Sequence, residues 1–236
     1  MAALGASDSF DELQELVAEI YGAPNDRWFD LADMATNISR FTMRAIKAVR
    51  RDDAGKVEKN LAIAISWFAS SANRLHMQVS QVTWRRFPYQ CATCRLCPCG
   101  CGASSLLAEE RIAKRPKPAT ISQLQERFAE LYPPESRSLE HAAIHLIEEV
   151  GEYQEALLMY RTRHRHADLR QVETEAADFV SCALGLYSSI DHKSNSSNGA
   201  ARALANLFDH NCHECRMSPC NCSFDRVMTY NLNDKW

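Results

Sequence analysis

Residues 145–158 read HLIEEVGEYQEALL and residues 172–187 read VETEAADFVSCALGLY, and these two stretches decide the fold. Both repeat apolar residues at intervals of three and four, which is the period of a helix packed along one side. Positions three and four apart share a helix face, so the acidic residues of each stretch converge on one edge of its helix. They are Glu148, Glu149 and Glu152 in the first stretch and Glu175 and Asp178 in the second.

The second acidic pair lies within an apolar run that is typical of a buried helix. Acids that face one another inside a helical bundle repel strongly unless a cation neutralises them. Ligands that are all oxygen suit Mg²⁺ or Mn²⁺. The alternative is a solvated acidic helix face, which the apolar surroundings of Glu175 and Asp178 disfavour. The residues therefore predict a divalent-metal site between two helices.

This acidic pattern resembles that of a known family. Glu-Glu-x-x-Glu at residues 148–152, a gap of twenty-two residues and Glu-x-x-Asp at residues 175–178 are similar to the signature of the MazG-like all-α nucleoside triphosphate pyrophosphohydrolases. The resemblance covers about residues 120–190. It implies Mg²⁺-dependent hydrolysis of an NTP or dNTP to the monophosphate and pyrophosphate. Without it, the residues predict only an acidic divalent-metal site in a helical bundle.

Roles for the five acids follow from charge. We expect Glu149, Glu152, Glu175 and Asp178 to coordinate Mg²⁺ (or Mn²⁺), which lowers the pKa of a bound water toward neutrality. Glu148 is either a further ligand or the base that activates this water, and the sequence does not separate the two roles.

Ten cysteines occur in the chain, and eight of them form two matched clusters. Residues 91–101 read CATCRLCPCGC and residues 212–222 read CHECRMSPCNC, so both share the spacing Cys-x-x-Cys-x-x-x-x-Cys-x-Cys. In a cytoplasmic chain, clusters of this kind favour metal over disulfides. Tetrahedral Zn²⁺ with a structural role is the preferred ion, and an iron–sulfur cluster is the runner-up. The ligands are Cys91, Cys94, Cys99 and Cys101 in the first loop and Cys212, Cys215, Cys220 and Cys222 in the second.

The matched clusters belong to a longer internal repeat. LQELVAEIYG at residues 13–22 resembles LQERFAELYP at residues 124–133, and the helical stretches that follow keep their apolar positions. The sequence therefore predicts an all-α fold: a tandem duplicated MazG-like helical bundle that forms an intramolecular pseudo-dimer. Each half is expected to contain a short helix, two long helices and a cysteine-rich metal loop. The predicted boundaries are residues 1–103, a linker at 104–119 and residues 120–236.

The two predicted halves differ chemically. Thr36, Asn37 and Arg40 align with the three glutamates of the first acidic stretch, while Asn60 and Ile63 align with the second acidic pair. The N-terminal half is therefore interpreted as a degenerate copy. It either completes the nucleotide pocket or serves as scaffolding alone.

A triphosphate also needs cations beside its outer phosphates. The connector YRTRHRHADLR at residues 160–170 lies between the acidic stretches, although a solvated charged turn is its alternative. Arg40 is a rival because it aligns with a carboxylate position. The candidate substrate-binding residues are Arg161, Arg163, Arg165, Arg170 and Arg40.

Composition narrows the class of protein. The 236 residues include 27 Lys plus Arg against 30 Asp plus Glu, a net charge of -3, which argues against a dedicated nucleic-acid binder. No apolar run reaches the length of a membrane span, and the N-terminus lacks the pattern of a secretory signal. We therefore expect a cytoplasmic protein without membrane contact, and the family resemblance implies that its substrate is a nucleoside triphosphate. A homodimer of pseudo-dimers is a further possibility.

Two functions remain open at this stage. The first is the metal-dependent pyrophosphohydrolase. The second is a non-catalytic module that senses nucleotide or metal and docks another protein through structural zinc loops. The intact set of five acids favours the enzyme.

Overall fold

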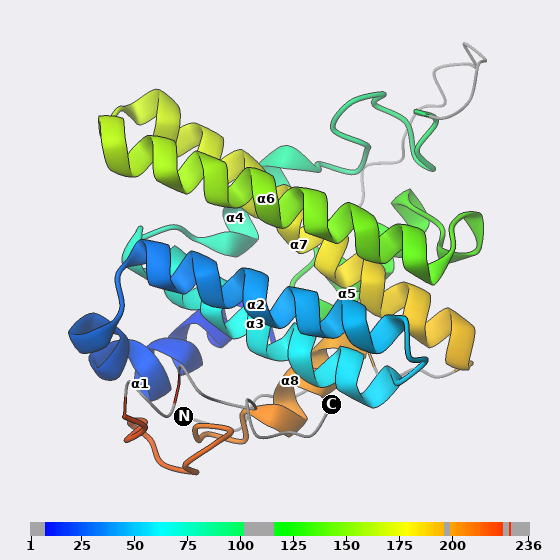
Figure 1. Cartoon of the computed structure of the whole chain (residues 1–236). Coiled ribbons are helices and arrows are strands. Elements are labelled where there is room, and N and C mark those ends of the chain that lie inside the picture. Colours follow the sequence, from blue (N-terminus) through cyan, green and yellow to red (C-terminus); the bar gives the residue numbers. More distant parts are fainter. Residues whose placement is uncertain (1–7, 102–115, 196–198, 224–226, 228–236) are drawn as a thin grey trace.

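The computed structural model describes residues 8–101, 116–195, 199–223 and 227, which form helices joined by turns, without a β-strand (Figure 1). The first part contains α1 (Phe10–Trp28), α2 (Leu31–Val49), α3 (Ala54–Arg74) and α4 (Val79–Arg86). The later part contains α5 (Ile121–Leu131), the 3₁₀ helix η1 (Pro134–Ser136), α6 (Leu139–Arg163), α7 (His166–Ser194) and α8 (Gly199–Leu207). The all-helical prediction is confirmed for these residues.

Side-chain caps set where several helices begin. The Ser9 hydroxyl accepts from the Glu12 amide, and the Glu12 carboxylate accepts from the Ser9 amide, which is a complete capping box at the start of α1. Asp30 and Asp33 repeat this arrangement at α2. Ser138 accepts from the amide of His141 and begins α6, the helix that carries the first acidic stretch.

Two helical hairpins form the centre of the molecule. α2 pairs with α3 and α6 pairs with α7, and the hairpins meet where α2 packs on α6 (Figure 1). Phe68, Tyr153 and Phe179 join α3, α6 and α7, with the Phe68 ring centroid 5.4 Å from that of Tyr153 and 4.5 Å from that of Phe179. The Tyr153 hydroxyl is fully buried and lies 2.8 Å from the Ser71 hydroxyl. The acidic helix α7 is therefore held at the middle of the core.

The short helices and the cysteine loops cross between the two parts of the chain. α4 packs on α7, and α8 packs on α3 and α5. The amide of Cys99 in the first loop donates to the Leu131 carbonyl at the end of α5, at 2.8 Å. In the second loop, drawn orange to red beside α1 in Figure 1, the Cys220 amide donates to the Ile20 carbonyl at 2.7 Å. Each loop thus docks on the first helix of the other part.

Two features of the fold differ from the sequence prediction, and one predicted segment lies outside the described residues. α1 is 19 residues long and not short, because the helix continues through Pro24 and ends with the Phe29 amide bonded to the Asn25 carbonyl. α4 and α8 were not expected, since 8 and 9 residues give too little periodicity to reveal a helix. Of the predicted linker, residues 104–115 lie outside the described part. None of the helices described is both long and apolar enough to span a bilayer.

Candidate metal centre

Three of the five predicted acids meet at one point. Carboxylate oxygens of Glu149 on α6 and of Glu175 and Asp178 on α7 all lie within 4.8 Å of one another. Glu148 and Glu152 are exposed and stand outside this set, although Glu152 is near enough to raise the pKa of Glu149 and of Glu175. We call Glu149, Glu175 and Asp178 the carboxylate set.

Helix geometry explains this division. The buried stripe of α6 includes Leu146, Val150 and Tyr153, and Glu149 borders it, so its side chain is only 14% exposed. Glu148 and Glu152 lie farther around the helix from this buried stripe, and both are exposed. α7 packs against α6, α4, α5 and α3, so its acidic edge with Glu175 and Asp178 becomes enclosed.

Arg86 is the cation beside the carboxylate set. It is the last residue of α4, and its Nε and Nη2 donate to the two carboxylate oxygens of Asp178 at 3.1 and 2.9 Å. Its neighbour Arg85 pairs with Glu173 at 2.8 Å. The sequence prediction missed Arg86 because candidates were sought near the acids along the chain or at positions aligned with them, and Arg86 is at neither. The signal was the basic pair at 85–86, placed directly before the first cysteine loop.

The carboxylate set carries unbalanced negative charge. Burial, followed by the charges of Asp178, Glu152 and Glu175, raises the pKa of Glu149 to about 7, although Arg86 opposes the rise. Burial also raises the pKa of Glu175, against a hydrogen bond from Gln171. Within the described part of the chain, Glu149 Oε2 is buried without a hydrogen-bond partner. A buried carboxylate oxygen without a donor and a set of oxygen ligands both fit a hard divalent cation such as Mg²⁺.

A second group of donors adjoins the carboxylate set and shares Glu149. His145 Nδ1 lies 3.6 Å from Cys182 Sγ, and His145 Nε2 lies 3.4 Å from Glu149 Oε1. One donor atom from each of these three residues lies within 4.8 Å of the other two.

The predicted arginines are mostly engaged in ion pairs. Arg161 pairs with Asp30 at 2.8 Å, and Arg165 holds Asp168 through two hydrogen bonds of 2.7 and 2.9 Å. Arg163 also faces Asp168, at 3.8 Å. The arginines of the charged connector therefore neutralise Asp168, which lies within the connector, and Asp30, the N-cap residue of α2. Arg170 is exposed on α7, one turn before the acids.

Arg40 lies beside a different part of the molecule. It donates to the Val227 carbonyl at 3.1 Å, and its guanidinium stands 5.3 Å from the Phe41 ring centroid. Burial and the nearby Arg44 lower its pKa. Both Val227 and Phe41 line the cavity beside the second cysteine loop, so Arg40 belongs to that region.

Each cysteine loop gathers its four thiols. In each loop, the four sulfurs lie within 4.8 Å of one another, so each loop could hold a metal ion such as zinc. Three sulfur pairs of the first loop are 3.5 to 3.8 Å apart, and two pairs of the second loop are 3.8 and 3.9 Å apart. A hydrogen bond from Cys220 has the largest effect on the pKa of Cys212, and backbone amides add to it. Together they lower this pKa to about 4, although burial opposes the shift. Cys97 and Cys182 stand outside both sets.

Comparison with protein-family models, with curated proteins and with solved structures found no match. Functional inference therefore depends on the residues and their geometry.

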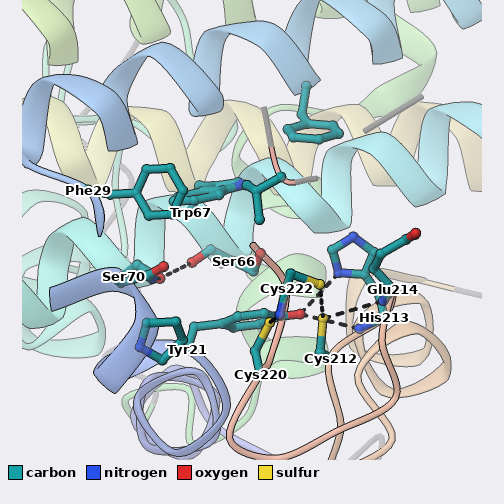
Figure 2. A pocket seen from close by; sticks show the side chains of 14 residues that line it. Tyr21, Phe29, Ser66, Trp67, Ser70, Cys212, His213, Glu214, Cys220 and Cys222 are labelled. Carbon is teal, nitrogen blue, oxygen red and sulfur yellow. Dashed lines mark hydrogen bonds between the residues drawn. The ribbon is translucent and has the colours of Figure 1, made fainter. Parts of the chain in front are cut away.

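An apolar cavity lies between α1, α3 and the second cysteine loop (Figure 2). Its volume is about 610 Å³ with the open mouth included. Phe29 and Trp67 meet edge to face on one side of it, with ring centroids 5.1 Å apart. Tyr21 and His213 close the opposite side, where the Tyr21 oxygen lies 3.0 Å from His213 Nδ1. The cavity thus brings aromatic rings to a candidate metal loop, on elements other than those of the carboxylate set.

Proposed function

We propose that this protein is a Mg²⁺-dependent nucleoside triphosphate pyrophosphohydrolase. The observation that carries the proposal is the convergence of Glu149, Glu175 and Asp178 from two helices. The buried, unpartnered oxygen of Glu149 supports a cation at this point. Mg²⁺ bound there would supply charge neutralisation for a triphosphate and a water of lowered pKa.

The acids take distinct roles in this proposal. The carboxylate set holds the metal, and Glu152 extends the set at its solvent side. Glu148 is exposed one position before Glu149, which leaves it as an outer ligand or as the base that orients water. Mn²⁺ has the same preference for oxygen ligands and substitutes for Mg²⁺.

We assign phosphate binding to Arg86, with Arg137 and Arg170 as further candidates. Arg86 reaches it from α4 and is 37% exposed, so it is accessible to an anionic ligand. Arg137 lies near Cys182, where its charge opposes the rise in the pKa of that thiol, and its Nε is buried without a partner in the described chain. A guanidinium fork suits phosphate oxygens. The exposed Arg170 is the member of the connector best placed to assist.

The cysteine loops are assigned structural zinc. Four thiolates at about 2.3 Å from one ion, in a tetrahedron, lie roughly 3.8 Å apart. The observed sulfur–sulfur distances match a single tetrahedral ion. An iron–sulfur cluster places several iron atoms between its thiolates and would need wider spacing.

We also propose that the two halves are duplicated copies. Gln14 accepts from the Val79 amide that starts α4 at 2.9 Å, and Gln125 accepts from the Ala200 amide in the first turn of α8 at 2.7 Å. The two loops share their backbone bonds as well: Cys91 to Leu96 and Cys212 to Met217, both at 3.0 Å. Matching contacts at matching positions support an intramolecular pseudo-dimer, in which the N-terminal half contributes Arg86. A homodimer of such chains and a cytoplasmic location stay predictions.

The test is release of pyrophosphate from a panel of NTPs and dNTPs, with and without Mg²⁺. Glu149→Ala and Asp178→Ala should abolish the release. Glu155→Ala is the matched control, because Glu155 is exposed on the same helix outside the set. The proposal fails if no nucleotide yields pyrophosphate, or if activity survives both substitutions.

A non-catalytic module is the second candidate, and the cavity of Figure 2 favours it. Aromatic rings beside a metal loop suit a planar ligand or a protein side chain. Calorimetry with nucleotides in Mg²⁺-free buffer separates the two functions. Binding that is unchanged in Asp178→Ala but lost in Trp67→Ala would favour the module.

A further inference from the structure

We propose that His145, Glu149 and Cys182 form a further metal site, selective for a transition-metal ion of the Zn²⁺ class. When an ion binds there, Glu149 is no longer available as a ligand of the carboxylate set. This site is separate from the two cysteine loops and uses nitrogen, oxygen and sulfur donors.

The spacing of the donors fits such an ion. In a tetrahedral zinc site, a Zn–S bond of about 2.3 Å and a Zn–N bond of about 2.0 Å hold sulfur and nitrogen roughly 3.6 Å apart. Cys182 Sγ and His145 Nδ1 are 3.6 Å apart. Glu149 supplies the third donor: one of its carboxylate oxygens, one ring nitrogen of His145 and Cys182 Sγ lie within 4.8 Å of one another. Three protein ligands with a fourth position left for water are typical of non-structural zinc sites.

A further observation points to a cation. Glu149 Oε2 is buried and lacks a hydrogen-bond partner among the residues described, so the carboxylate has capacity for another ligand. Cys182 is only 7% exposed, and burial, followed by the charge of Glu149, raises the pKa of its thiol, although Arg137 opposes the rise. A bound cation would displace the thiol proton to solvent and neutralise the thiolate and carboxylate together.

Ligand type sets the preference between the two neighbouring sites. Sulfur and imidazole nitrogen favour zinc or cobalt over magnesium, whereas the carboxylate set favours magnesium. Because Glu149 belongs to both, zinc at the mixed site withdraws an oxygen from the magnesium site. Zinc is therefore expected to inhibit the Mg²⁺-dependent reaction, and this consequence rests on the proposed function.

Cobalt provides a readout that is independent of activity. Co²⁺ is added to protein whose cysteine loops already hold zinc. We expect a near-ultraviolet thiolate-to-cobalt band that saturates at one added ion per chain and is absent from Cys182→Ser. His145→Ala should weaken binding by at least roughly 10–100-fold, the cost of losing even an outer-shell partner.

Matched controls define the site. Cys97→Ser removes the other thiol that lies outside both loop sets, and His141→Ala removes an exposed imidazole one turn before His145. Both should keep the band. A band that is missing from the wild type, or that persists in Cys182→Ser, overturns the proposal. His145→Ala changes a half-exposed side chain, so it remains informative if Cys182→Ser folds poorly.

Inhibition is measured separately, with each variant compared with its own zinc-free rate. Cys182→Ser should need at least tenfold more zinc than wild type for half-inhibition, about the loss expected for a missing ligand. Equal zinc sensitivity in the two proteins contradicts the sharing of Glu149. If no nucleotide is hydrolysed but the cobalt band behaves as expected, the proposed function fails and the metal site stands.

Discussion

Glu149→Gln is expected to stabilise the magnesium-free protein at alkaline pH. The substitution keeps the size of the side chain and removes its charge. Burial and the neighbouring acids raise the pKa of Glu149 in the folded protein from an ordinary 4.5 to about 7. The folded state therefore resists ionisation of this carboxyl more than the unfolded state does.

The sign and size follow from linkage. Because the folded pKa is the higher one, the wild type loses stability as pH rises from about 4.5 through about 7. A shift of this size corresponds to about 3 kcal/mol at most. Solvent reaches part of the side chain and screens the charges, so we expect about 1–2 kcal/mol. The Gln side chain does not titrate, so Glu149→Gln should not lose this stability as the pH rises.

Urea unfolding at about pH 5 and about pH 8 measures the effect. The buffer should lack Mg²⁺ and chelators, so that ions in the cysteine loops are retained. Glu149→Gln should gain stability relative to wild type between the two pH values, while the exposed Glu155→Gln should not. A stability difference that is independent of pH, or a variant that is less stable at the higher pH, would refute the reasoning. Added Mg²⁺ should stabilise wild type and not Glu149→Gln.

Three further outcomes are expected. Arg86→Ala leaves the carboxylate of Asp178 without its two donors, so it should lower the free energy of unfolding by about 1–2 kcal/mol in Mg²⁺-free buffer and by less when Mg²⁺ is bound, as urea unfolding will show. Cys212→Ser should lower the zinc content by one ion per chain relative to wild type, measured by elemental analysis, and an unchanged content would exclude the four-thiol site. Tyr153→Phe should cost about 1 kcal/mol in thermal unfolding, because Ser71 loses its buried partner, and an unchanged melting temperature would contradict that contact.

The period of the apolar residues was sufficient to predict the long helices. It also predicted the edge of α6 and of α7 on which the acidic residues lie. Apolar residues at Leu146, Val150 and Tyr153 place Glu149 beside the buried stripe, so its convergence with α7 follows from helix geometry. The cysteine spacing likewise predicted two four-thiol loops, and the thiols do gather. Local pattern carries this information because neighbours along a helix or a tight loop are also neighbours in space.

Contacts between distant segments could not be predicted in this way. Arg86 reaches Asp178 across 92 residues of chain, and only the packing of α4 on α7 brings them together. His145 and Cys182 are 37 residues apart in the sequence, and only the packing of α6 against α7 brings them together. Arg161 seemed suited to phosphate but pairs with Asp30, because α6 ends beside the start of α2.

Each cysteine loop docks on the first helix of the other half, so the two halves hold each other at two separate contacts. A half expressed alone would keep its loop but lose the carbonyl, Leu131 or Ile20, that receives it. The C-terminal half alone would also lose Arg86. The halves should consequently melt in one transition, and neither should survive as an autonomous fragment.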